Sequence, residues 1–257
     1  MSETRDAVHE RYRSAALRMA SLSSDCCGSD CCGGPSVDDE IEACGSSYPA
    51  DEMAQVGLDS SISLGCGNPL LLAELHPGEA VLDLGSGGGL DVLLSARRVA
   101  PGGHVYGVDM TDEMLALANR NRDQAGVTNA TFLKGTIEQV PLPADSVDVV
   151  ISNCVINLAE DKGAVIREAF RILKPGGRLA VSDMVELKPL PDPVKQDLDA
   201  IAGCIAGTIP VERYRELLLE AGFQVPEIEI TGEQSVEGMA GAIGSASVRA
   251  RKPAGKA

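Results

Sequence analysis

The chain has 257 residues, of which 44% are hydrophobic and only 3% aromatic, and its formal net charge is −16. This length is sufficient for a large core, and an aliphatic composition is typical of buried parallel strands. The acidic balance argues against nucleic acid and anionic membranes as partners, because clustered Lys and Arg bind both. No apolar run approaches the ~20 residues of a membrane span. The charged N-terminus also lacks the apolar region of a signal peptide. We therefore expect a cytoplasmic protein, and we expect it to be a monomer.

Residues 1–18 have the pattern of an amphipathic helix. Val8, Tyr12, Ala15 and Met19 recur at helical spacing and would lie on one side. This side is expected to pack against the rest of the protein.

The chain contains eight cysteines, which in a cytosolic protein favour metal binding or thiol chemistry over a disulfide framework. Four of them, Cys26, Cys27, Cys31 and Cys32, lie in a repeated Ser-Asp-Cys-Cys-Gly sequence that is predicted to form a loop. Thiolates select soft ions, so these four are candidate ligands for a metal or metalloid. Adjacent pairs do not have the spacing of a structural zinc site. The alternative is a tail whose cysteines have no role in binding.

From residue 79 onward, strand-like and helix-like segments alternate. Strands are predicted at 80–84, 104–108, 130–134, 147–152 and 178–182, with helices at 91–99, 111–126 and 162–173. This alternation is typical of an α/β protein with a doubly wound, mostly parallel sheet.

The pattern changes after residue 184. Helices are predicted at 194–206 and 211–221, and two strands at 224–230 and 246–251 would complete a seven-stranded sheet. The second of these strands would be antiparallel at an edge. We expect three parts: an N-terminal helix with cysteine-rich loops (1–70), a core (71–185) and a cap with closing strands (186–257).

A glycine turn follows the first predicted strand. Gly85, Gly87 and Gly89 give the pattern G-x-G-x-G, in a strand–turn–helix context that favours a nucleotide-like ligand. Residue 90 is Leu, so the dinucleotide pattern G-x-G-x-x-G is not met. Asp109 ends the second strand 24 residues after Gly85, close to the ~20 expected before an acid that accepts from ribose hydroxyls.

Together with Asp83 before the turn and Lys174-Pro175-Gly176-Gly177 before the fifth strand, this pattern resembles the Rossmann-like S-adenosylmethionine-dependent methyltransferases. The resemblance implies that the acid and the glycine turn hold the methionine part of the cofactor and that Asp109 holds the ribose. Glu138 would lie near the adenine; the alternative for Glu138 is a surface charge. The expected cofactor-binding residues are Asp83, Gly85, Ser86, Gly87, Asp109, Met110, Thr136, Ile137, Glu138 and Asn153.

Two cysteines indicate which atom receives the methyl group. Cys154 follows the strand 147–152, and ligands of open α/β sheets bind beyond the carboxyl ends of the strands. Cys204 lies 50 residues later, on the predicted helix 194–206, which would close the same opening. Thiols that converge on a methyl donor imply a thiophilic acceptor.

The segments 63–69, 152–158 and 202–207, which contain Cys66, Cys154 and Cys204, resemble the arsenite methyltransferase family, and the likeness runs from about residue 8 to residue 253. The resemblance implies that Cys154 and Cys204 bind trivalent arsenic, with Cys66 and Cys44 joining in binding or in redox steps. It also implies methyl transfer from S-adenosylmethionine to arsenite and methylarsenite. Glutathione or thioredoxin would be the reductant. No general base is needed, because the arsenic lone pair carries no proton.

Two other functions stay open at this point. A methyltransferase for a small organic acceptor would need acid or base side chains, but His9, His76 and His104 fall outside the expected ligand-binding ends of the strands. A soft-metal sensor or sequestering protein would use the cysteine repeat. Removal of the first 35 residues would abolish binding in the sensor and spare an enzyme.

Overall fold

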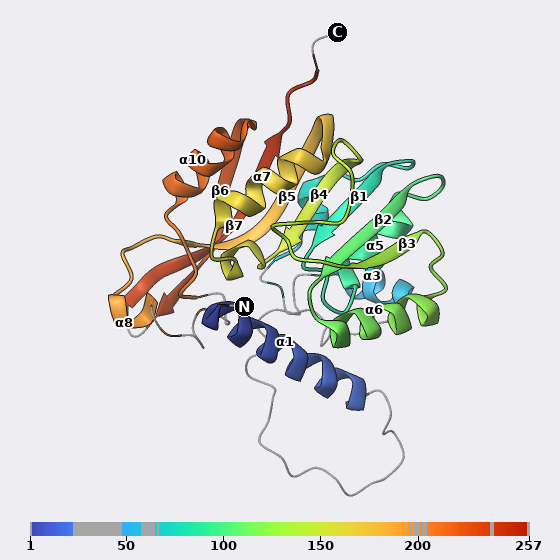
Figure 1. Cartoon of the computed structure of the whole chain (residues 1–257), viewed down its shortest axis with the longest axis horizontal. Helices are drawn as coiled ribbons and strands as arrows, with labels where there is room; N and C mark the ends of the chain where they lie inside the picture. The colour runs from blue at the N-terminus through green and yellow to red at the C-terminus, as the bar shows by residue number, and fades with distance from the viewer. Residues whose placement is uncertain are drawn as a thin grey trace, which may run out of the picture.

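A seven-stranded sheet forms the centre of the protein, as the sequence predicts. The computed structural model describes residues 2–22, 48–57, 65, 67–195, 197, 201, 205–236 and 239–255. The strand order is β3-β2-β1-β4-β5-β7-β6 (Figure 1). The strands are β1 (Ala80–Leu84), β2 (His104–Asp109), β3 (Ala130–Lys134), β4 (Val147–Asn153), β5 (Leu173–Glu186), β6 (Gln224–Val236) and β7 (Met239–Arg251). The first five pair in parallel, which confirms the predicted mostly parallel α/β class.

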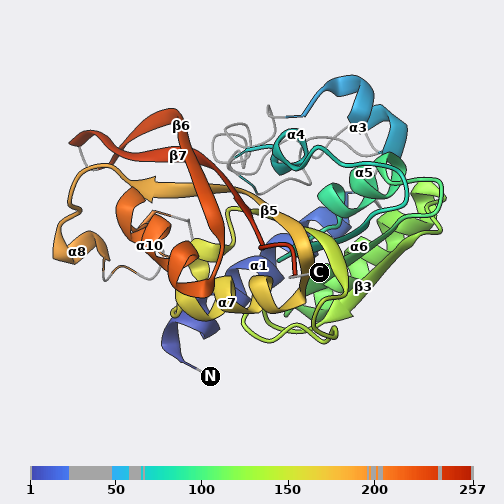
Figure 2. The ribbon, with the colours of Figure 1, turned by 90° about the horizontal axis from the view of Figure 1, so that it is seen from above.

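Helices cover both faces of the sheet, so apolar strand residues are buried on either side (Figure 2). On one face lie α3 (Ala50–Val56), α4 (Pro69–Ala73) and α5 (Leu90–Arg98); on the other lie α7 (Lys162–Ile172) and α10 (Val211–Ala221). The helix α6 (Asp112–Ala125) packs against β2 and β3. It ends at Gly126, whose φ of 64° is favourable for glycine at a helix C-terminus.

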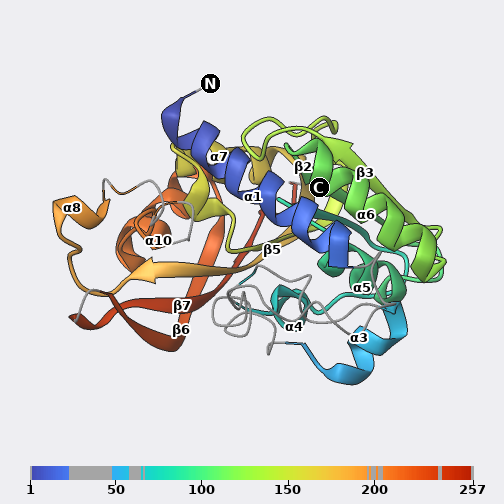
Figure 3. The same ribbon diagram turned by 90° about the horizontal axis from the view of Figure 1, so that it is seen from below.

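The N-terminal helix α1 (Glu3–Leu22) confirms the predicted amphipathic face. Ala15 and Ala16 are buried against Met114 and Leu117 of α6. Figures 1 and 3 show that α1 lies across the ends of the strands rather than on a face of the sheet. None of the helices among the described residues is long and apolar enough to cross a membrane.

The position predicted for the last strand is wrong. β7 is antiparallel as expected, but it lies between β5 and β6, and β6 is the edge strand. The burial explains this order, because alternate small apolar residues of β7 are buried while nearly all of β6 is at least partly exposed. Glu227, Glu229 and Glu233 on β6 are typical of a protected edge.

Two further predictions need correction. Lys174-Pro175-Gly176-Gly177 lies within the bounds of β5 rather than before it, as a bulge between the paired residues Leu173 and Arg178. Of the helix predicted at 194–206, the structure describes α8 (Asp192–Lys195), while 205–207 form a bend and a turn. The turn is closed by Thr208, whose amide and hydroxyl both donate to the Ile205 carbonyl. The three-part division of the chain stays a prediction.

Candidate functional site

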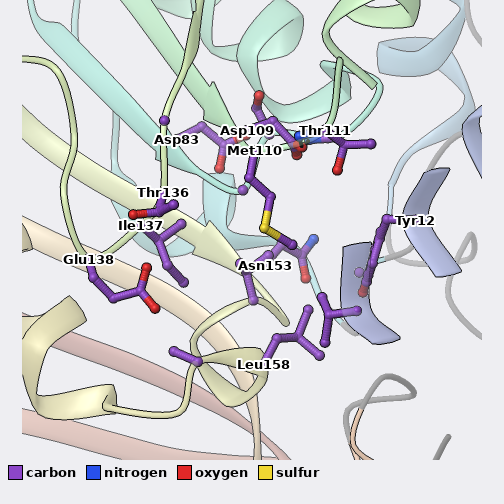
Figure 4. Close-up of a pocket in the computed structure, with 18 of the residues that line it drawn as sticks. Tyr12, Asp83, Asp109, Met110, Thr111, Thr136, Ile137, Glu138, Asn153 and Leu158 are labelled. Atoms are coloured by element: carbon purple, nitrogen blue, oxygen red, sulfur yellow. Dashed lines mark hydrogen bonds between the residues drawn. The ribbon is translucent and has the colours of Figure 1, made fainter. Parts of the chain in front are cut away.

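A cavity opens at the carboxyl ends of β1, β2 and β4, where the strand order reverses (Figure 4). Ligands of doubly wound sheets bind at this point. All ten residues predicted to bind the cofactor line the cavity: Asp83, Gly85, Ser86, Gly87, Asp109, Met110, Thr136, Ile137, Glu138 and Asn153. Their contacts with a cofactor stay a prediction, but the sequence pattern located the cavity.

The glycine turn forms one wall of the cavity. The amides of Gly85 and Ser86 both donate to the Val108 carbonyl, which fixes the turn against the end of β2. Gly85 has a φ of 72°, and a Cβ there would lie 2.4 Å from the Val155 side chain, so only glycine fits. Ser86 Oγ is buried and has no hydrogen-bond partner among the described residues.

Three carboxyl groups surround the same space: Asp83 and Asp91 are buried, and Asp109 is partly buried. Burial raises the pKa of Asp83 well above its usual value, and the charges of Asp91 and Asp109 raise it further. Burial also raises the pKa of Asp91 to about 6. The pKa of Asp109 is raised by burial too, although the amides of Thr111 and Gly87 donate hydrogen bonds to its carboxylate. A cationic ligand would relieve this repulsion. The ammonium and sulfonium groups of S-adenosylmethionine fit such a site.

The helix α1 lies over the cavity and supplies three lining residues that are not among the predicted cofactor-binding residues: Arg5, Val8 and Tyr12, the last of which is labelled in Figure 4. Arg5 Nη2 lies 2.9 Å from Glu138 Oε1. Glu138 is therefore not merely a surface charge. The amphipathic pattern identified Val8 and Tyr12 as inward-facing, but no local signal joins Arg5 to a residue 133 positions away.

Asn153, the last residue of β4, joins the cavity to the chain segment that contains Cys66. Its Oδ1 accepts from the Gly67 amide at 3.2 Å, and its Nδ2 donates to the Gly67 carbonyl at 2.8 Å. A Cβ on Gly65 would lie 2.2 Å from the Asn153 side chain. The two residues that flank Cys66 in the chain therefore both lie against Asn153.

Cys154 follows directly. It is 3% exposed and has a φ of 57°, and its amide donates to the Ser182 carbonyl at 2.8 Å. Apolar side chains surround it, among them Met184, Leu190 and Ile243. Cys154 is disulfide-bonded, and it is the one cysteine among the described residues.

The other seven cysteines, Cys26, Cys27, Cys31, Cys32, Cys44, Cys66 and Cys204, lie outside the described residues, so their predicted roles stay predictions. Within the described ranges, no group of three or more His, Cys, Asp or Glu side chains could hold a metal ion. None of the three histidines lines the cavity, and His104 bonds Thr131 instead. The described part of the cavity therefore offers no histidine for acid–base chemistry.

The class of protein follows from a match to a family model. Residues 75–222 match the family model described as a methyltransferase domain. With the sheet order and the glycine turn, this match places the chain among the Rossmann-like methyltransferases that use S-adenosylmethionine.

The particular family follows from longer matches. The chain is 43% identical to the arsenite methyltransferase of Halobacterium salinarum over 98% of this chain and 67% of that protein. It is 40% identical to that of Aquipseudomonas alcaligenes over 75% of this chain and 59% of that protein. The crystal structure of an arsenic (III) S-adenosylmethionine methyltransferase from Chlamydomonas reinhardtii matches with a TM-score of 0.65 at 33% identity, over 88% of this chain and 76% of that one. The chain belongs to the arsenite methyltransferase family, and it spans 59 to 67% of the two curated relatives.

Proposed function

We propose that the protein transfers methyl groups from S-adenosylmethionine to trivalent arsenic bound by Cys154 and further cysteine thiolates. The observation that carries this proposal is the position of Cys154. It comes directly after Asn153, which lines the cofactor cavity, and it is disulfide-bonded. Once reduced, a cysteine thiolate beside a methyl-donor site suits a thiophilic acceptor.

The residues around the cavity would bind and orient the cofactor. Asp109 would accept from the ribose hydroxyls, Asp83 and the glycine turn would hold the methionine part, and Thr136, Ile137 and Glu138 would contact the adenine. When bound, S-adenosylmethionine supplies an electrophilic methyl group on a sulfonium. The contribution of these residues is to fix its direction relative to Cys154.

The thiolates would exchange with the oxygen ligands of arsenite, which leave as water, and the bound arsenic keeps its lone pair. The apolar cluster that contains Cys154 would exclude water from the arsenic. The arsenic lone pair would accept the methyl group in line as the carbon–sulfonium bond breaks, which would give S-adenosylhomocysteine and a pentavalent methylarsenic species. The protein needs no general base for this step, because the nucleophile carries no proton.

A second methylation requires two electrons to return the arsenic to the trivalent state. Two cysteine thiols can supply them by forming a disulfide, and the disulfide-bonded state of Cys154 supports this part of the proposal. Glutathione or thioredoxin would then reduce the enzyme by thiol exchange. We include a cytoplasmic location, where thiols stay reduced, and a monomeric state in this proposal.

The test is to incubate purified protein with arsenite, S-adenosylmethionine and a thiol reductant and to separate the arsenic species by chromatography. We expect mono- and dimethylated arsenic to form, and their absence would refute the proposal. Formation of S-adenosylhomocysteine without arsenite, in the presence of a small organic acceptor, would favour the other class of methyltransferase. Light scattering on the same preparation tests the monomer.

A further inference from the structure

Tyr48 lies at a buried polar contact between three segments that are far apart in the sequence. Its hydroxyl donates to Asp91 Oδ1 at 2.7 Å and accepts from Asn153 Nδ2 at 2.9 Å. Its ring packs in the apolar cluster of α3, α4 and α5, and the residue is 7% exposed. Neither Tyr48 nor Asp91 is among the predicted site residues.

Each partner of the hydroxyl also faces the cofactor cavity, because Asp91 and Asn153 both line it. Asn153 in turn holds Gly67 by two hydrogen bonds. One hydrogen bond therefore joins the Tyr48 hydroxyl to each of two residues of the cavity wall, and a second hydrogen bond leads from Asn153 to Gly67, the residue after Cys66. Tyr48 itself follows Cys44 by four positions.

The charges keep this contact intact at neutral pH. Burial raises the pKa of Tyr48 well above its usual value, and the charge of Asp91 raises it further, so the hydroxyl keeps its proton and donates. Burial raises the pKa of Asp91 to about 6, while hydrogen bonds from Tyr48 and Asn153 and the charge of Arg98 oppose that rise. At neutral pH the carboxylate is mostly ionised, and a hydrogen bond to a buried charge is stronger than a neutral one.

We propose that Tyr48 is a positioning residue that couples the cofactor cavity to the thiol site. Through Asp91 and Asn153, its hydroxyl holds Tyr48 and Gly67 at the end of β4, directly before Cys154. This inference rests on the proposed function and specifies which buried contacts join the cofactor cavity to the residues before Cys154.

Coupling follows from the shared partners. A ligand that contacts Asp91 or Asn153 stabilises one arrangement of their side chains, and that arrangement is the one that holds Tyr48 and Gly67. Cofactor binding and arsenic binding must then strengthen each other by the same factor, because coupling between two sites is reciprocal.

The substitution Tyr48→Phe tests this, since it removes one oxygen atom and keeps the ring in its cluster. The measurement is the affinity for S-adenosylhomocysteine, with and without arsenite, by calorimetry on the full reduced protein. In the native protein we expect arsenite to strengthen S-adenosylhomocysteine binding by about tenfold. In Tyr48→Phe we expect this factor to fall to nearly one, with kcat for arsenite methylation lowered by about tenfold or more.

The matched control is Tyr214→Phe, because Tyr214 is also fully buried and its hydroxyl also lies beside a buried carboxyl, that of Asp183. We expect it to keep the tenfold coupling. Equal coupling in Tyr48→Phe and native protein would overturn the proposal, as would loss of coupling in both variants. Thermal melting of each variant shows whether it is folded; should Tyr48→Phe fail to fold, Asn153→Ser provides the same cycle without altering the ring.

Failure of the proposed function itself has a different signature. The native protein would then show no arsenite methylation and no effect of arsenite on S-adenosylhomocysteine binding, before any variant is compared. A native protein that methylates arsenite while Tyr48→Phe retains native coupling refutes only the role of Tyr48.

Discussion

Cys154 has a left-handed backbone conformation, with a φ of 57°, which few residues other than glycine adopt. Such strain persists only where surrounding contacts impose it, and it clusters at functional sites. Here the contacts are the hydrogen bond from its amide to Ser182 and the hydrogen bonds of Asn153 just before it. The sulfur direction is therefore set by the neighbours of Cys154.

Replacement of the sulfur tests the assigned substrate group. We expect Cys154→Ser to abolish arsenite methylation, because a serine hydroxyl binds trivalent arsenic far more weakly than a thiolate does. We expect the affinity for S-adenosylhomocysteine, measured by calorimetry, to stay within about threefold of native, since the sulfur is not among the residues lining the cavity. Methylation at the native rate would show that the arsenic is held elsewhere.

The substitution Gly65→Ala tests whether close packing against Asn153 matters for methylation. A methyl group there would lie 2.2 Å from Asn153 atoms, so Gly65→Ala must displace that side chain. We expect the methylation rate to fall by about a hundredfold, because small displacements of reacting groups are costly.

Gly232→Ala is the matched control for Gly65→Ala, since no described heavy atom lies within 4 Å of the added carbon. It should methylate arsenite at the native rate. Similar rates for the two variants would argue against any role of Asn153 in positioning.

At the scale of elements, the sequence did not predict which elements α1 packs against. Its apolar face can be predicted from the spacing of its residues, and Val8, at the cavity wall, is 4% exposed. The surface that it covers is assembled from the loop after β3 and from α6, which come together only in the fold. Helical periodicity therefore identified which face of α1 is buried, but it did not identify the elements that this face packs against.

Loss of apolar contact at this wall should weaken cofactor binding. We expect Val8→Ser to lower the affinity for S-adenosylhomocysteine by about tenfold, because about 1.5 kcal/mol of burial is lost. Leu17→Ser on the same helix is 51% exposed and should bind as the native protein does. Calorimetry on both variants checks this, and equal affinities would mean that α1 does not contribute to the cavity.

The strands and the glycine turn were predictable because their signals are local: apolar runs, turn residues and the spacing to Asp109. The order of the last two strands was not, because β6 and β7 both alternate and only pairing with β5 decides which becomes the edge. The contact of Tyr48 with Asp91 and Asn153 was also beyond the sequence, since it joins residues that are 43 and 105 positions apart.

For the molecule as a whole, the buried carboxyls link stability to pH. Asp183 is fully buried, and Asn157 Nδ2 donates to its Oδ1 at 2.7 Å, but burial still raises its pKa from 3.8 to about 7. Between these pH values the Asp183 carboxyl is protonated in the folded protein and ionised in the unfolded chain. Stability therefore falls as the pH rises from about 4 to about 7 and then levels off.

The variant Asp183→Asn removes this titration and keeps an acceptor for Asn157. The quantity to compare is the free energy of unfolding of Asp183→Asn minus that of the native protein, measured with urea. We expect this difference to be larger at pH 8 than at pH 5 by on the order of 1 to 4 kcal/mol. Asp123→Asn, at a carboxylate with 70% exposure, serves as the control and should show no such change. A constant difference between Asp183→Asn and native protein at both pH values would contradict the assigned titration.

The position of α1 has a consequence for the order of events during repeated methylation. The helix closes the cofactor cavity, whereas Cys154 lies in a separate apolar cluster beside β5 and β7. In the proposed reaction, α1 would have to move for cofactor to pass Arg5, Val8 and Tyr12, and this movement would leave the apolar cluster of Cys154 in place. One arsenic atom bound at Cys154 would then receive successive methyl groups without release, with each round paced by the movement of α1.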